Sequence, residues 1–297
     1  MDRFLQYRIP PEADGLRAEQ YLSRMGYSRQ VRITLKKFPD GLLLNGYPVY
    51  MTHPVHSGDL LNIHLQDVSS SAQVCPVRLP LDILYEDEDL LVVNKPAGMP
   101  THPSMNHYTD TLANALAYYY ASQNQTFVFR CCNRLDQDTS GLTIIAKNLL
   151  SSCILSRMAV RKEIRREYLG IVRGRPASPD GTISIPLGRK PGSVIERTAD
   201  WEHGEAAVTH YHIEGFYGEY TLLRLVLETG RTHQIRIHLK CLGTPLIGDY
   251  LYNPDMERIR RQALHSCRLS FIHPIHGQKL DFSAPLPKDM EQVLHSS

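Results

Sequence analysis

The sequence has almost no excess of charge of either sign, few cysteines and no long hydrophobic run. Its 33 basic residues against 31 acidic residues give a net charge of only +2, so the total charge does not by itself indicate a nucleic-acid partner. No apolar stretch approaches the roughly 20 residues that a membrane-spanning helix requires. We therefore expect a protein without a membrane partner.

The cysteines carry no sign of a metal site or a redox motif. None forms a C-x-x-C pair, and no cysteine or histidine group has the spacing of zinc ligands. The first 15 residues lack the apolar core of a signal peptide. We expect free thiols, no bound metal and a cytoplasmic location. The six cysteines are Cys75, Cys131, Cys132, Cys153, Cys241 and Cys267.

A length of 297 residues suits a catalytic domain with a smaller accessory domain. Residues 67–81, rich in serine and proline, are typical of a linker, which predicts a small domain over residues 1–66 and a larger one over residues 82–297. In the small domain, residues 16–25 predict a helix and Ser28 an N-cap for a second helix. An Asn-Gly pair at 45–46 between apolar runs predicts a hairpin.

Residues 82–297 predict an α+β domain with a mixed, largely antiparallel sheet. Strand-like and helix-like segments alternate irregularly there, without the regular βαβ rhythm of a parallel sheet. Strands are expected over residues 84–94, 142–146, 168–172 and 222–227. Two helices are expected, one with Thr109 as N-cap and one with Thr232 as N-cap that ends near Gly243.

The polar loop Asn133–Gly141 is the first candidate for chemistry. Asp136 lies next to Arg134, and a carboxylate held by a cation stays ionised and suits nucleophilic attack or base catalysis. The alternative is an Asx-turn that only caps the strand that follows. Spacing alone favours the Asx-turn.

A second candidate lies at residues 229–238, with the sequence TGRTHQIRIH. Arg231 stands just ahead of the expected helix, where its side chain and the helix N-terminus form a site for a phosphate or a carboxylate. Arg236 and His238 fall inside the helix. The alternative is an ordinary amphipathic helix with a basic outer face.

The segment of residues 156–175 is also basic, because it contains seven lysines and arginines and only two glutamates. Tyr168 lies at the end of this run, on an expected strand, and a tyrosine beside arginines can stack on an extruded base. Such a run is more often a solvated surface, and such a tyrosine more often fills a half-buried sheet position.

Taken in order, these segments resemble the RluA-type pseudouridine synthases. The resemblance covers about residues 82–290 and rests on five segments. They are VNKPAG at 93–98, NRLDQDTSG at 133–141, YLGIVRG at 168–174, GRTHQIRIH through GD at 230–249, and the C-terminal strands from Leu264 to Pro285. The N-terminal part is similar to an S4-type RNA-binding module. The family commonly has histidine where this chain has Asn133.

The resemblance implies an enzyme that isomerises uridine to pseudouridine in RNA without a cofactor. Asp136 would be the nucleophile, Arg231 would pair with it and keep it charged, and Tyr168 would stack on the base. The expected partner is structured RNA, and the S4-type module favours ribosomal over transfer RNA. Residues expected to contact RNA are Arg134, Lys95, Arg165, Arg166, Arg29, Lys36 and Lys37.

Two other classes of function compete with this interpretation. A non-catalytic RNA-binding protein with the same fold would not require an intact Asp136–Arg231 pair. A glycosidase acting on a small nucleoside would leave the basic segments unexplained, and it usually needs a second carboxylate.

Overall fold

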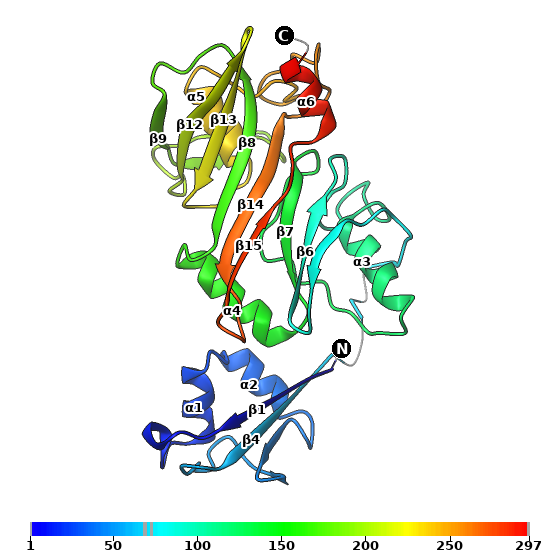
Figure 1. Cartoon of the computed structure of the whole chain (residues 1–297), viewed down its shortest axis with the longest axis vertical. Helices are drawn as coiled ribbons and strands as arrows, with labels where there is room; N and C mark the ends of the chain where they lie inside the picture. Colours follow the sequence, from blue (N-terminus) through cyan, green and yellow to red (C-terminus); the bar gives the residue numbers. More distant parts are fainter. Residues whose placement is uncertain (1, 68–69, 72–73, 296–297) are drawn as a thin grey trace.

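The computed structural model describes residues 2–67, 70–71 and 74–295. Two main β-sheets lie at opposite ends of the long axis, a small one near the N-terminus and a large one formed by later strands (Figure 1). Helices pack beside both sheets. The chain therefore has the predicted α+β fold with a mixed, largely antiparallel sheet.

The small N-terminal domain is a four-stranded antiparallel sheet with two short helices, consistent with the S4 type. Its strand order is β1-β4-β2-β3. Ser28 caps the second helix through its side chain, as predicted. Asn45 and Gly46 both have positive φ, which is the geometry of the predicted two-residue hairpin. The elements are β1 (Asp2–Arg8), η1 (Pro11–Ala13), α1 (Ala18–Arg24), α2 (Arg29–Leu35), β2 (Leu42–Leu44), β3 (Tyr47–Pro48) and β4 (Leu60–Gln66).

The large sheet has nine strands in the order β5-β6-β7-β14-β8-β13-β12-β9, with β15 paired to β14. Only the pairing of β7 with β14 is parallel among the described strands. The strands are β5 (Ile83–Glu86), β6 (Leu90–Lys95), β7 (Ser140–Ala146), β8 (Arg165–Arg173), β9 (Asp180–Ser184), β12 (Val208–Tyr217), β13 (Tyr220–Leu227), β14 (Leu264–Ile272) and β15 (Lys279–Ser283).

Four helices and a small hairpin accompany this sheet. They are α3 (Leu112–Ala121), α4 (Leu149–Val160), α5 (Gln234–Cys241), α6 (Lys288–His295) and the hairpin of β10 (Leu187–Arg189) and β11 (Arg197–Ala199). Two predicted N-caps were wrong. Thr111 caps α3 in place of Thr109, since its hydroxyl receives the amide of Asn114. His233, in the left-handed region, precedes α5 in place of Thr232. Among the described residues, no helix is long and apolar enough to cross a bilayer.

Helix α4 joins the two domains. Leu150, on α4, is buried in the hydrophobic core of the small domain, and Ile154 packs against the same core. Arg157, also on α4, donates a hydrogen bond to the carbonyl of Gly26. Figure 1 shows α4 lying between the large sheet and helices α1 and α2. The small domain is thus docked by apolar burial rather than by the chain connection alone.

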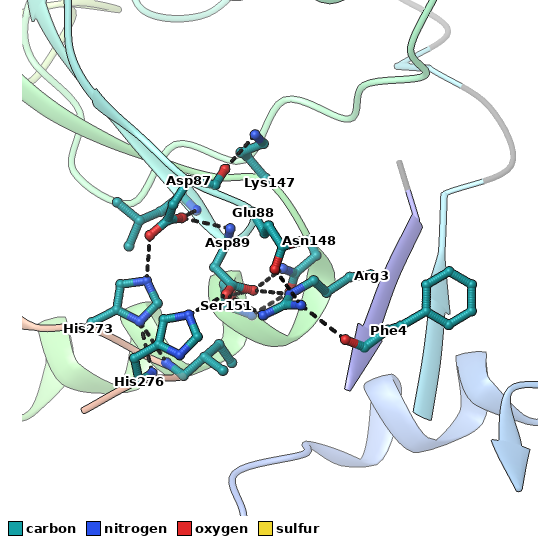
Figure 2. Close-up of polar contacts among 12 residues, drawn as sticks. Arg3, Phe4, Asp87, Glu88, Asp89, Lys147, Asn148, Ser151, His273 and His276 are labelled. Atoms are coloured by element: carbon teal, nitrogen blue, oxygen red, sulfur yellow. Dashed lines mark hydrogen bonds and ion pairs between the residues drawn. The ribbon is translucent and has the colours of Figure 1, made fainter. Parts of the chain in front are cut away.

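A buried ion pair adds to this docking. Arg3, on β1, donates two hydrogen bonds of 3.0 Å to Asp89, which begins the turn into β6 and is fully buried (Figure 2). Asn148 and Ser151, at the start of α4, donate to the same carboxylate. A buried carboxylate needs such partners because desolvation of an unpaired charge is costly.

We expect Arg3→Ala to loosen the docked domain. Removal of one partner of a buried pair typically costs about 3–5 kcal/mol, so undocking should become about a hundredfold to several thousandfold more frequent. Protease cleavage between residues 67 and 81 measures this opening. Arg8→Ala is the matched control, because Arg8 lies on the same strand and donates only to the Gly58 carbonyl. Equal cleavage rates in the two variants would show that Arg3 does not hold the domain.

Candidate active site

A cavity of about 550 Å³ opens beside β8 and the N-terminal end of α5. Its walls come from residues 131–139, from the start of β8 and from residues 227–236, so segments about 100 residues apart in the chain meet there. The floor is apolar, because Leu135, Tyr168, Ile235 and Leu264 belong to one buried cluster. The edge is polar and mostly basic.

The loop that carries Asp136 is fixed on both sides of that residue. The hydroxyl of Thr101 donates to the carbonyl of Leu135 at 2.8 Å, and the ammonium of Lys95 donates to the carbonyl of Gln137 at 2.9 Å. Asp136 itself accepts the amide of Thr139 through its backbone carbonyl. The carboxylate is therefore presented from a backbone that has little freedom to move.

Gly141 allows the strand after this loop to approach β14. Its φ is +112°, and a Cβ at this position would lie 2.3 Å from the carbonyl oxygen of Ser266. No other residue type fits without separating β7 from β14. This parallel contact places the end of the Asp136 loop against β14, next to Tyr168 on β8.

Arg236 is the cation that reaches Asp136. Its Nη1 lies 3.1 Å from Oδ2 of Asp136, while Nε and Nη2 each donate at 2.7 Å to the carboxylate of Asp249. Burial alone lowers the pKa of Arg236, but Asp249 and Asp136 raise it above its ordinary value. The guanidinium remains charged, and it joins the loop to the turn at Asp249.

The predicted pair of Asp136 with Arg231 was wrong. Arg231 lines the same cavity, but its guanidinium forms an ion pair with Glu205 and donates to the carbonyl of Ala206 at 3.2 Å. Arg231 precedes α5 and points away from the helix axis, whereas Arg236 lies on the buried face of α5. Arginine is rarely buried unless it is paired, and the two carboxylates of Asp249 and Asp136 meet that condition for Arg236.

The expected RNA contact at Lys95 was also wrong. Lys95 is fully buried, and its ammonium donates to the carbonyls of Pro96, Met99 and Gln137. Burial lowers the pKa of Lys95 to about 7, although the Asp138 and Asp136 carboxylates oppose that shift. Lys95 therefore fixes the backbone of the loop and is not accessible to RNA.

Of the six other basic residues expected to contact RNA, two line the cavity and four do not. Arg134 and Arg166 lie in its wall. Arg165 points elsewhere, and its Nε donates to Glu167 at 2.7 Å. Arg29, Lys36 and Lys37 lie on or next to α2 in the small domain and are exposed.

The geometry can be compared with known proteins. Residues 89–240 match the model of the RNA pseudouridylate synthase family. The chain is 39% identical over 276 residues to the uncharacterized RNA pseudouridine synthase YjbO of Bacillus subtilis, covering 93% of this chain and 97% of that protein. It is 36% identical over 299 residues to the ribosomal large subunit pseudouridine synthase D of Escherichia coli CFT073, covering 94% and 90%.

The chain belongs to the RNA pseudouridylate synthase family. It is an RNA pseudouridine synthase, and therefore an isomerase. The fold agrees, since the solved structure of human RNA pseudouridylate synthase domain containing 1 superposes with a TM-score of 0.57 at 27% identity, over 69% of this chain and 83% of that one.

Asn133 occupies the position where this synthase family commonly has histidine. Its amide nitrogen donates to the carbonyl of Leu142 at 3.2 Å, and its amide oxygen accepts from the backbone of Ile144 at 2.7 Å. Thr143 donates to its carbonyl. These bonds tie the loop to β7, so Asn133 supplies positioning that does not require a titratable ring.

His233 is a pocket residue that sequence reasoning missed in this synthase. Its φ of 58° is unusual for a residue other than glycine, and it turns the chain into α5. Nδ1 lies 2.9 Å from the hydroxyl of Tyr252, and Nε2 lies 3.8 Å from Asp136. Burial lowers the pKa of His233, although Asp136 opposes this shift, so the ring is mainly neutral at pH 7.

One group outside the cavity has the residue types of metal ligands. Asp89, His273 and His276 bring ligand atoms within 4.8 Å of one another. Nδ1 of His273 accepts the amides of Ile275 and His276, and Nε2 donates to Asp87 at 2.9 Å (Figure 2). Since Arg3 also binds Asp89, these groups are satisfied by partners within the protein.

The two arginines of the pocket should differ in their effect on stability. Arg236→Ala leaves the buried Asp249 without its cation, which should lower the free energy of unfolding by about 3–5 kcal/mol. Arg231→Ala breaks an exposed pair, worth about 0–1 kcal/mol. Chemical denaturation of both variants measures the difference. Equal losses would contradict the assignment of Arg236 as the buried partner of the site.

Proposed function

We propose that this synthase converts a flipped uridine in large-subunit ribosomal RNA to pseudouridine, with Asp136 as the nucleophile. The single observation that carries the proposal is the contact of Asp136 with the buried guanidinium of Arg236 in the wall of the cavity. A carboxylate in that position is held in one orientation beside a cation, as nucleophilic attack requires.

The other carboxylate of the cavity is poorly suited to this role. Glu228 is bound by Lys162 at 2.5 Å and by His210 at 2.7 Å, both at the outer surface. Asp136 is 28% exposed and lies above the apolar floor. A glycosidase would need two carboxylates facing one sugar, and this second one is already engaged.

The reaction breaks the bond between C1′ of the ribose and N1 of uracil and forms a bond from C1′ to C5. N1 gains a proton and C5 loses one, so there is no net redox change. Asp136 attacks the flipped uridine or its ribose, and the detached base turns before it bonds again. The base must leave the RNA stack first, because an enzyme cannot reach the glycosidic bond inside it.

The surroundings of Tyr168 support a role in stacking on the flipped base. It is only 5% exposed, and its ring shares the apolar cluster of the floor with Leu135 and Ile235. Burial raises the pKa of Tyr168, so its hydroxyl stays protonated. A neutral ring at the bottom of an apolar cavity suits stacking against a planar uracil.

Two observations favour large-subunit ribosomal RNA over transfer RNA as the target. The Escherichia coli relative at 36% identity is a ribosomal large subunit pseudouridine synthase. The small domain also presents Arg29, Lys36 and Lys37 to solvent, away from the cavity, where they can contact the phosphates of a large RNA. Pseudouridine mapping of total RNA from cells lacking the gene, against the parent strain, identifies the target directly.

Asp136→Asn should abolish isomerisation. The amide keeps the size of the carboxylate but is not nucleophilic, so we expect turnover to fall by about 10⁴-fold or more while RNA affinity stays within a few-fold. Tritium release from C5-labelled uridine in RNA measures turnover. Glu228→Gln is the control and should keep near-normal turnover. Wild-type rates in Asp136→Asn would show that another group attacks.

Removing three positive charges from the small domain should weaken its binding to large RNA. We expect the triple change of Arg29, Lys36 and Lys37 to Gln to reduce the salt slope of binding by about 2–3, since each lost phosphate contact removes about 0.9. The measurement is the affinity for a large-subunit ribosomal RNA transcript between 50 and 200 mM salt. Lys279→Gln, on β15, serves as the control. An unchanged slope would remove the small domain from the RNA interface.

A further inference from the structure

A second, smaller cavity adjoins the active-site cavity, and three arginines line it. Its volume is about 350 Å³, and we call it the arginine pocket. It lies between the β10–β11 hairpin and the segment that leads into α5. Its lining residues are Leu187, Gly188, Arg189, Arg197, Glu205, Gly230, Arg231 and Thr232.

Two of its arginines lie directly opposite each other, and their like charges repel. Arg189 and Arg197 are direct cross-strand partners in the β10–β11 hairpin. Side chains directly opposite each other lie about 5 Å apart at their Cβ atoms, and like charges in such a pair destabilise the hairpin. The arrangement becomes favourable when an anion lies between the two guanidinium groups.

These arginines have no carboxylate partner among the described residues. The guanidinium of Arg197 donates only to the carbonyl of Glu196, its neighbour in the chain. Arg189 forms no ion pair with any described residue. The contrast is Lys190, on the same hairpin, which pairs with Glu196 at 2.6 Å. The charge of Lys190, which does not line the pocket, is thus neutralised by a carboxylate. The charges of Arg189 and Arg197, which line it, are not.

The third arginine is held by a carboxylate at the pocket's edge. Arg231 pairs with Glu205, whose side chain is 66% exposed. Backbone hydrogen bonds between Leu187 and Glu205 fix Glu205 beside the hairpin. Such an exposed pair is worth little in stability, so an anion that binds more arginines at once can displace the Glu205 carboxylate.

The arginine pocket and the active-site cavity share a wall. Gly230, Arg231 and Thr232 line both of them. An RNA strand whose uridine enters the active-site cavity therefore passes its backbone close to this wall. The anion that such a strand carries at every nucleotide is a phosphate, which arginine binds through two parallel hydrogen bonds.

We propose that the arginine pocket binds a backbone phosphate of the RNA next to the flipped uridine, and that Glu205 holds Arg231 in place until that phosphate arrives. Arg189, Arg197 and Arg231 supply the positive charge, and Glu205 turns to solvent when RNA binds. The proposal rests on the use of the neighbouring cavity for the uridine. It does not depend on which RNA is the target or on which group attacks.

The test is the binding of a twelve-nucleotide oligouridylate to the full-length enzyme across a salt series. The double change Arg189→Gln and Arg197→Gln should weaken binding by about tenfold or more and reduce the salt slope by about 0.7, the value for one phosphate contact on a single strand. Glu205→Gln should strengthen binding, because the competing carboxylate is gone. Lys190→Gln is the matched control and should change neither quantity appreciably.

Three results would overturn the proposal. They are an unchanged affinity in the double variant, an equal loss in Lys190→Gln, and weaker binding in Glu205→Gln. Inorganic phosphate separates the two sources of the anion: competition with the oligouridylate in the wild type, but not in the double variant, supports the site. Phosphate that binds the pocket without affecting RNA affinity would assign it to a free anion instead.

This binding experiment is independent of the chemistry proposed for Asp136. If Asp136→Asn keeps its turnover while the double variant loses RNA affinity, the nucleophile is misassigned and the arginine pocket stands. If Asp136→Asn is inactive and the double variant binds normally, the pocket is misassigned and the nucleophile stands.

Discussion

The active site depends on one buried guanidinium held between two carboxylates. Arg236 is bound by Asp249 on one side and by Asp136 on the other, and only Asp136 is open to the cavity. Asp249 fixes the guanidinium through two parallel bonds, so Arg236 reaches Asp136 in one orientation only. Positive charge is thereby placed beside the Asp136 carboxylate while the Arg236 side chain itself stays buried and out of reach of the RNA phosphates.

The rest of the loop follows from this constraint. A carboxylate is useful as a nucleophile only if its backbone does not yield, since small displacements from a productive geometry are costly in rate. Lys95, Thr101 and Asn133 each bond to the backbone of the loop or of the strand that follows it. All three are buried polar or charged side chains, and these hydrogen bonds offset the cost of burying them.

Motif spacing predicted the fold class, the Asn45-Gly46 hairpin and the segments that line the cavity, because each depends on local chemistry or on the order of motifs. It did not predict which arginine meets Asp136. Arg231 and Arg236 lie five residues apart, and the positive φ of His233 decides where the helix begins and hence which of them faces inward. Lys95 was misjudged for a similar reason, since the sequence records its charge and not its burial.

The near-neutral total charge and the RNA substrate are compatible because the basic side chains are unevenly paired with carboxylates. Arg3, Arg130, Arg173 and Arg224, for example, all meet carboxylates of the protein itself. Within the described part of the chain, the arginines without an acidic partner include Arg134, Arg166, Arg189 and Arg197, and all four line one of the two adjoining cavities. Composition counts every charge equally, whereas the charge that a cavity offers to an RNA strand depends on whether a carboxylate already neutralises it. Around these two cavities the available positive charge is therefore set by where carboxylates are missing, which no count of lysines and arginines can reveal.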